Sequence, residues 1–212
     1  IMRKHFSLKN KLVLIFGLLF SVSLILAAIL AVNRAQKAVL EKVEIHLTDK
    51  ATDVAEIVDG RVSAVVQFIE GLARMPFLRD ESMSLTEKAR LLVKESERNK
   101  KIDYFGICDT QGRRYDASGF RMSVSDRQWF KSALKGKSFI TEPLLSSITN
   151  DMQIVIAVPL YDDNDTVIGV LNAGIPALLL SDEINDIAVG KTGECYILGL
   201  TGNAIAHKNF EA

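Results

Sequence analysis

The chain has 212 residues, of which 26 are basic and 26 are acidic, so its formal net charge is zero. A balanced charge argues against a large basic surface, and we therefore expect no nucleic-acid partner. The residues outside the apolar N-terminal segment suffice for one domain with a hydrophobic core.

Cysteine and histidine are sparse and scattered. Cys108 and Cys195 lie far apart in apolar stretches, which favours two buried thiols over a disulfide or a metal site. His5, His46 and His207 form no cluster with the spacing of metal ligands. No serine–histidine or cysteine–histidine pattern suits nucleophilic catalysis. We therefore predict a protein without metal, cofactor or enzymatic activity.

The first element is an uncharged apolar run from Leu12 to Val32. A helix of this length spans roughly 31 Å, which matches the hydrocarbon core of a bilayer. Basic residues precede the run at Arg3, Lys4, Lys9 and Lys11. Residues 1–11 are therefore predicted to be cytoplasmic, with the following chain across the membrane. A cleaved signal peptide is the alternative, but helical periodicity continues past the run and favours an uncleaved anchor.

Residues 33–76 are predicted to form one long amphipathic helix. Apolar residues recur with a mean step of about 3.6 residues, the period of a straight α-helix. They are Val43, Leu47, Ala51, Val54, Val58, Val62, Val65, Ile69 and Leu72. Pro76 ends the pattern. The helix is expected to lie along a globular body; a coiled-coil stalk, pairing with a second copy near the membrane, is the alternative.

A shorter helix and a hairpin follow. Ser84 and Glu87 form a capping box that begins a helix reaching Lys101. Tyr104–Cys108 is predicted to be a buried strand, followed by a turn and by a return strand at Arg113–Asp116.

The next segment predicts a sheet. Ser125–Leu134 is expected to be a helix capped by Ser125 or Asp126, and Phe139–Thr141 a brief strand. Gln153–Tyr161 and Thr166–Ile175 form a hairpin across an acidic turn, which lacks the glycine and glutamate of a calcium loop. The predicted fold class is α+β, with the long helix lying across antiparallel strands.

The last part resembles the beginning of a second module. A helix is predicted at Ala177–Ala188, and a strand, turn and strand at 194–207. This repeats the hairpin that opens about 90 residues earlier, which indicates two related modules at 77–188 and 189–212. A module of one hairpin cannot bury its apolar face, so we expect the natural protein to continue beyond Ala212.

The ordered motifs resemble the double-Cache sensor domains of bacterial methyl-accepting chemotaxis proteins. The matching segments are Val124–Phe130, Ala133–Lys137, Thr141–Pro143, Ile156–Tyr161, Ile168–Leu171 and Gly190–Gly193. The resemblance implies two stacked PAS-like modules on a long helix, with a small-molecule pocket in the membrane-distal module.

The resemblance also implies a location and partners. The chain would sit in the inner membrane, with its sensor region in the periplasm or outside the cell. A cytoplasmic region not included in this chain would contact a histidine kinase and a coupling protein, in a homodimer. The alternatives are the input domain of a sensor histidine kinase or cyclic-dinucleotide enzyme, or an interaction module without a small ligand.

Arg127 and Trp129 are the first candidates for ligand contact. A guanidinium offers a planar fork of donors that matches a carboxylate, and the indole adds a donor and a flat apolar wall. In amino-acid receptors of the resembling family, these two positions hold the ligand carboxylate. The alternative is that Arg127 pairs with Asp126, Asp116 or Asp151, and that Trp129 belongs to the core with Phe130.

Other candidate positions depart from the amino-acid-binding pattern. Phe130 and Leu144 stand where that family often has tyrosine, and Gly174 stands where it has the aspartate that binds the ammonium group. An ammonium group would lack a negative partner there, so we expect a carboxylate or other anionic ligand without an obligatory amine. Tyr115, Asp116 and Met122 precede the motif and are further candidates for the pocket wall.

Overall fold

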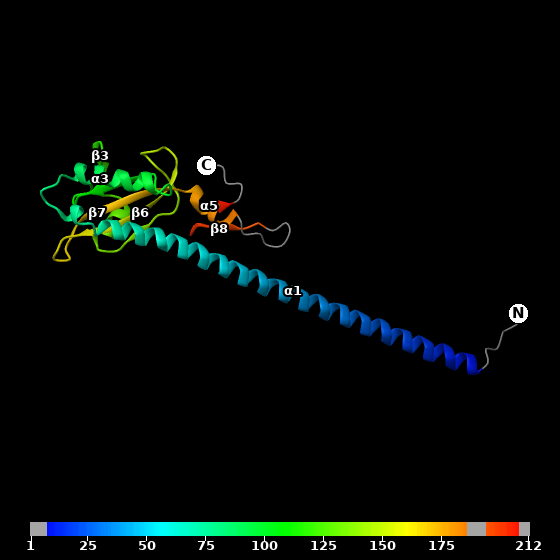
Figure 1. The fold of residues 1–212 in the computed structure, drawn as a ribbon. Helices are drawn as coiled ribbons and strands as arrows, with labels where there is room; N and C mark the ends of the chain where they lie inside the picture. The colour runs from blue at the N-terminus through cyan, green and yellow to red at the C-terminus, as the bar shows by residue number, and fades with distance from the viewer. Residues whose placement is uncertain (1–7, 186–193, 208–212) are drawn as a thin grey trace. The chain divides into compact units, whose positions relative to one another are not determined.

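The computed structural model describes residues 8–185 and 194–207, and the α+β class is confirmed. The helices are α1 (Leu8–Ala73), α2 (Pro76–Arg79), α3 (Leu85–Arg98), α4 (Gln128–Leu134) and α5 (Leu178–Asn185). The strands are β1 (Tyr104–Cys108), β2 (Arg113–Asp116), β3 (Gly119–Ser123), β4 (Phe139–Ile140), β5 (Leu144–Leu145), β6 (Met152–Tyr161), β7 (Val167–Pro176), β8 (Tyr196–Leu198) and β9 (Ala204–His207). The chain divides into two compact units, residues 1–52 and 53–212 (Figure 1).

The predicted membrane span and the predicted backing helix belong to one 66-residue helix, α1. Within the described residues, α1 alone is long and apolar enough to cross a membrane. The two serines of the apolar run Leu12–Val32 have hydrogen-bond partners within the helix: Ser21 donates to the Gly17 carbonyl at 2.8 Å and Ser23 to the Phe20 carbonyl at 2.8 Å. These two hydroxyls are thus satisfied inside the helix, as a hydrocarbon environment requires.

In the second unit, one face of α1 packs on the globular body. The buried and half-buried positions include Val54, Val58, Val62, Ile69 and Leu72. They repeat at the predicted helical spacing, so the predicted amphipathic face is confirmed over this part of α1. The helix ends at Ala73, three residues before Pro76.

The body is a seven-stranded antiparallel sheet with the path β3-β2-β1-β7-β6-β4, and β5 also pairs with β6. Its centre is the β6–β7 hairpin, whose register runs from Gln153 opposite Pro176 to Tyr161 opposite Val167. Side chains alternate between the two faces of a strand. Nearly every residue of β6 and β7 is buried, so both faces of this hairpin are covered.

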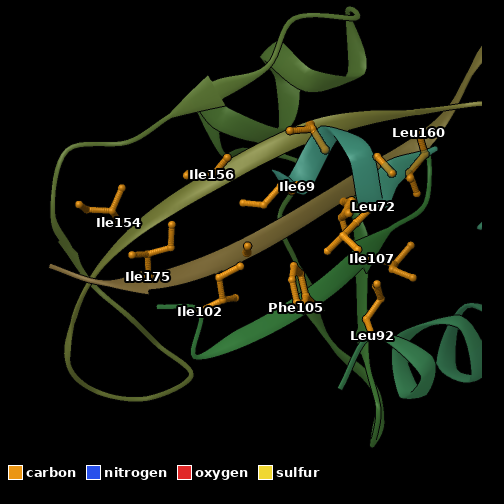
Figure 2. Close-up of a cluster of buried hydrophobic side chains, with 14 of the residues drawn as sticks. Ile69, Leu72, Leu92, Ile102, Phe105, Ile107, Ile154, Ile156, Leu160 and Ile175 are labelled. Atoms are coloured by element: carbon orange, nitrogen blue, oxygen red, sulfur yellow. The ribbon is translucent and has the colours of Figure 1, made fainter. Parts of the chain in front are cut away.

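One face of the sheet packs against α1 and α3. Figure 2 shows this cluster, in which Ile69 and Leu72 of α1 and Leu92 of α3 lie beside strand residues. Ile154 and Ile156 supply the β6 side chains of this face. Burial of these aliphatic groups provides the main hydrophobic stabilisation of the unit.

The other face packs against α4. Trp129, Phe130 and Ala133 of α4 lie in a second buried cluster with Val155 of β6 and Val170 of β7. Val155 stands between Ile154 and Ile156, so consecutive residues of β6 serve opposite clusters.

Several local predictions are confirmed, and others need correction. The capping box is present: the Glu87 amide donates to Ser84 Oγ and the Ser84 amide to Glu87 Oε2. The helix predicted from Ser125 begins instead at Gln128, because a turn comes first, in which the Arg127 amide donates to the Val124 carbonyl at 3.0 Å. Strands β3 and β5 were not predicted.

The second hairpin has its predicted strands, β8 and β9. The predicted helix after the sheet is found as α5 up to Asn185. Its predicted end at Ala188 and the Gly190–Gly193 motif lie outside the described residues.

Candidate functional site

A cavity of about 580 Å³ opens on the face of the sheet that α4 covers. Its lining comes from all seven strands of the sheet, the start of α4, the loops around β4 and β5, and the β8–β9 turn. The lining residues are Tyr104, Arg114, Met122, Val124, Arg127, Gln128, Trp129, Phe139–Ile148, Val155, Asn172, Leu200 and Thr201. A volume of this size suits a small organic ligand.

Four residues on four neighbouring strands line the cavity from the sheet: Tyr104, Arg114, Val155 and Asn172. The strand register places Tyr104 and Arg114 on the same face of the sheet. Arg114 of β2 stands opposite Cys108 of β1, and Tyr104, Gly106 and Cys108 share one face because side chains of a strand alternate. The buried arginine fits because Gly106 has no side chain: a Cβ there would lie 2.4 Å from Arg114 Nη2.

The Arg114 side chain is 2% exposed and poorly satisfied. Its Nε donates to Asn172 Oδ1 at 3.3 Å and its Nη2 to the Phe105 carbonyl at 3.5 Å. Its Cζ lies 5.2 Å from the centre of the Tyr104 ring, a cation–π arrangement. Among the described atoms, Nη1 has no hydrogen-bond acceptor.

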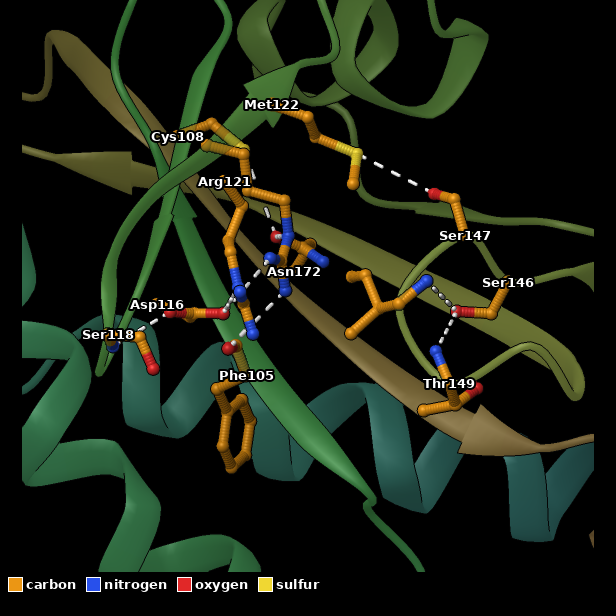
Figure 3. A network of polar contacts seen from close by, with 12 residues as sticks. Phe105, Cys108, Asp116, Ser118, Arg121, Met122, Ser146, Ser147, Thr149 and Asn172 are labelled. Carbon is orange, nitrogen blue, oxygen red and sulfur yellow. Dashed lines mark hydrogen bonds and ion pairs between the residues drawn. The ribbon is translucent and has the colours of Figure 1, made fainter.

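The charge around Arg114 is not balanced locally. Asp116 Oδ2 is 4.0 Å from Arg114 Nη1, and the same oxygen accepts from Arg121 Nε (Figure 3). Burial raises the pKa of the Cys108 thiol to about 12, so it contributes no negative charge. Burial also lowers the pKa of Arg114, although a guanidinium stays protonated in proteins. One carboxylate therefore faces two guanidinium groups.

The two leading candidates from the sequence lie at the cavity. Arg127 is the N-cap of α4, its side chain is 54% exposed, and its Nε is 4.0 Å from Asp126 Oδ1. This contact is the ion pair that the alternative interpretation of Arg127 predicts, although the distance is too long for a hydrogen bond. Trp129 belongs both to the buried cluster under α4 and to the cavity lining. Their ligand contacts remain predictions.

Two other candidates line the cavity and one does not. Met122 of β3 and Leu144 of β5 are lining residues, and Met122 Sδ accepts from Ser147 Oγ at 3.6 Å. Phe130 is 3% exposed, stands edge-on to Trp129 with ring centres 6.3 Å apart, and lies outside the lining. Phe130 thus belongs to the core that positions Trp129.

The remaining three candidates lie beside the lining residues. Tyr115 packs edge-on against Phe120 with ring centres 5.8 Å apart. Asp116 accepts from the Ser118 amide at 2.8 Å and pairs with Arg121. Gly174 lies beneath the Tyr104 ring: a Cβ there would be 2.2 Å from Tyr104 Cζ.

Gly174→Ala is expected to lower the free energy of unfolding by about 2 kcal/mol, because the new methyl group overlaps the Tyr104 ring. In a Tyr104→Ala background the same change should cost less than about 0.5 kcal/mol, since the ring is gone. Urea denaturation followed by fluorescence of Trp129, the single tryptophan, measures both. The matched control is Gly60→Ala, which meets no atom within 4 Å. If Gly174→Ala lowered the free energy of unfolding equally with and without the Tyr104 ring, contact with that ring would not be the cause of the cost.

One carboxylate lines the cavity. Glu142 Oε1 accepts from the Leu200 amide at 2.7 Å, which ties the loop between β4 and β5 to the β8–β9 turn. With Arg114 and Arg127, the lining carries two positive charges and one negative charge.

Sequence reasoning missed Arg114, Asn172 and Glu142 as lining residues. A signal existed for Asn172, because it is the single strongly polar residue in the apolar run of β7. A polar side chain in the centre of a buried strand needs a partner, which here is Arg114.

The chain is similar to sensor domains of bacterial receptors. A family model described as Cache domain matches residues 31–212. The methyl-accepting chemotaxis protein McpA of Bacillus subtilis (strain 168) is 24% identical over 218 residues, which cover 97% of this chain and 32% of that protein. The chain thus spans about a third of the length of that curated relative.

Solved structures show the same fold. The sensory domain of the Campylobacter jejuni chemoreceptor Tlp3 with isoleucine bound is 19% identical, with a TM-score of 0.62, over 76% of this chain and 69% of that chain. The ligand-binding domain of PctB from Pseudomonas aeruginosa PAO1, in complex with L-Arg, is 19% identical with a TM-score of 0.64 over 80% and 72%. That of PctC, in complex with GABA, is 20% identical with a TM-score of 0.60 over 77% and 75%.

Proposed function

Because this chain belongs to the Cache domain family, we propose that it is the extracytoplasmic sensing region of a transmembrane chemoreceptor and binds a small ligand in the cavity beside α4. The observation that supports this most is the cavity of about 580 Å³, which gathers Arg127, Trp129, Met122 and Leu144 at one place. All four are positions that the sequence predicts as ligand contacts.

The proposed ligand carries a carboxylate or another anionic group and needs no amine. Arg127 offers an exposed guanidinium at the start of α4, and Trp129 offers an adjacent aromatic wall. The Tyr104 ring covers Gly174. Gly174 stands where the amino-acid receptors that this chain resembles have the aspartate that binds the ammonium group. The ligands in the Tlp3, PctB and PctC structures are the amino acids isoleucine, L-Arg and GABA, and each of them carries a carboxylate.

The proposed route of the signal is α1. Ligand binding would favour one packing of the sheet against α1, and α1 would carry the change toward the membrane. In the proposed receptor, a homodimer in the inner membrane passes the signal to a cytoplasmic histidine kinase and its coupling protein. The same input region attached to a kinase or cyclic-dinucleotide domain is the second candidate, and sequencing the remainder of the gene distinguishes them.

Arg127→Ala is expected to weaken binding of a carboxylate ligand at least about ten-fold, because a charge-assisted hydrogen bond is lost. The full chain in lipid nanodiscs is titrated with a panel of small carboxylates and α-amino acids. Binding is followed by Trp129 fluorescence and by the melting temperature, which a ligand of the folded state raises.

The matched control is Arg98→Ala, which removes an exposed arginine that pairs with Glu95 on α3, away from the cavity lining. It should bind the same probe with unchanged affinity. Wild-type affinity in the Arg127→Ala variant would contradict the assigned role of Arg127. A panel in which no compound binds the wild-type chain would contradict the sensing function itself.

A further inference from the structure

Arg114 is the second arginine of the cavity lining. It belongs to the sheet side of the cavity, formed with Tyr104, Val155 and Asn172, which we call the floor. We propose that Arg114 is a buried anion-binding residue, which takes a carboxylate or another compact oxyanion of the ligand through its Nη1 group. This inference rests on the proposed function, because it requires the cavity to be the ligand site.

Burial is the first argument. The Arg114 side chain is 2% exposed, yet it is also a lining residue of the cavity, so the cavity is where a partner can reach it. A guanidinium has five N–H donors. Within the described structure, two long hydrogen bonds to Asn172 and Phe105 are its hydrogen-bond partners, and Nη1 has none.

Charge is the second argument. A buried cation is costly unless an anion is paired with it at good geometry. Asp116 is 4.0 Å from Nη1 and is already bound by Arg121. Asn172 and Tyr104 are neutral, and Glu142, the carboxylate of the lining, is bound to the Leu200 amide. A ligand anion would supply the missing charge.

The floor also holds the guanidinium in one place, as a specific site requires. Gly106 leaves the space that the guanidinium fills, the Tyr104 ring stacks on it, and Asn172 Oδ1 fixes Nε. An arginine whose rotamer is already fixed loses less entropy when it binds a ligand.

The test compares carboxylates with their neutral amides in the full chain, carried in lipid nanodiscs with Arg127→Ala to remove the other guanidinium. The probes are lactate and lactamide, succinate and succinamide, and benzoate and benzamide. If Arg114 binds the anion, at least one carboxylate still binds about ten-fold or more tightly than its amide. Adding Arg114→Met should remove this preference, and Arg114→Lys should keep part of it.

Unliganded stability separates binding from a structural role. Because Arg114→Met replaces an unbalanced buried charge with an apolar side chain of similar length, its melting temperature without ligand should equal or exceed that of the parent chain. Probes that bind with the same carboxylate preference in Arg114→Met would overturn the inference and leave the sensing function intact. If Arg114→Met does not fold, equal binding of carboxylates and amides by the Arg127→Ala chain would overturn it. Wild-type chains that bind no probe would overturn both proposals.

Discussion

Gly112→Ala is expected to lower the free energy of unfolding by about 3 kcal/mol, one of the largest effects of a single methyl group in this chain. Gly112 has φ +78°, a region that costs an L-residue about 1–2 kcal/mol. A Cβ there would also lie 2.7 Å from the Ser125 Cα, which is backbone and cannot rotate away. The Val124 amide donates to the Gly112 carbonyl at 2.8 Å, so the clash falls on the segment that carries Arg127.

The matched control for this change is Gly202→Ala. Gly202 has φ +81°, nearly the same as Gly112, but a Cβ there would meet nothing within 4 Å. Urea denaturation monitored by Trp129 fluorescence should give a loss of about 1 kcal/mol for the control. Equal losses for the two variants would show that backbone conformation alone, and not the contact with Ser125, sets the cost.

Leu92→Ala is expected to cost about 3 kcal/mol of unfolding free energy. Leu92 of α3 is fully buried between the helix and the sheet, in the cluster of Figure 2. Removing its isobutyl group loses both the transfer free energy of the side chain and the contacts around the resulting void. Urea denaturation followed by Trp129 fluorescence measures the loss of unfolding free energy. Trp129 lies on the opposite face of the sheet from Leu92, so the substitution does not change the surroundings of the probe.

Its neighbour provides the control. Leu91 is 40% exposed on the same helix, so Leu91→Ala should change the free energy of unfolding by less than about 1 kcal/mol. Because both changes remove the same atoms from adjacent positions of α3, helix propensity cancels in the comparison. A similar cost for the two variants would mean that α3 does not pack on the sheet through Leu92.

The elements that the sequence predicted correctly are those with strong local signals. The capping box of α3 depends on residues three apart, and the packed face of α1 on a regular helical period. The strands β6 and β7 are long apolar runs flanking an acidic turn. Each signal lies within a few residues of the chain, so no knowledge of tertiary structure was needed.

The missed elements depend on partners far along the chain. β3 is a mostly exposed edge strand in which Phe120 and Met122 alternate with polar residues over only four positions, too short a pattern to predict a strand. It is ordered by pairing with β2. β5 has two residues and forms by pairing with β6. Intrinsic strand propensity is weak where a cross-strand neighbour supplies the stabilisation.

The floor of the cavity was missed for a related reason. Arg113 and Arg114 are adjacent and identical in type, but Arg113 is exposed and paired with Asp109, whereas Arg114 is buried. The register between β1 and β2, which sets Arg114 opposite Cys108, decides which of the two points inward. The sequence motif around Arg127 predicted the part of the cavity lining at the start of α4. The floor depends on the register between strands, which the sequence does not reveal.

Strand β6 separates the cavity on one face of the sheet from the hydrophobic cluster on the other face. Val155 lines the cavity, while Ile154 and Ile156, its immediate neighbours, belong to the cluster that contains Ile69 of α1. Because a close-packed interior has low compressibility, a displacement of Val155 is expected to move the two isoleucines with it. In the proposed receptor, a ligand that displaces Val155 is therefore expected to act on α1 across a single strand.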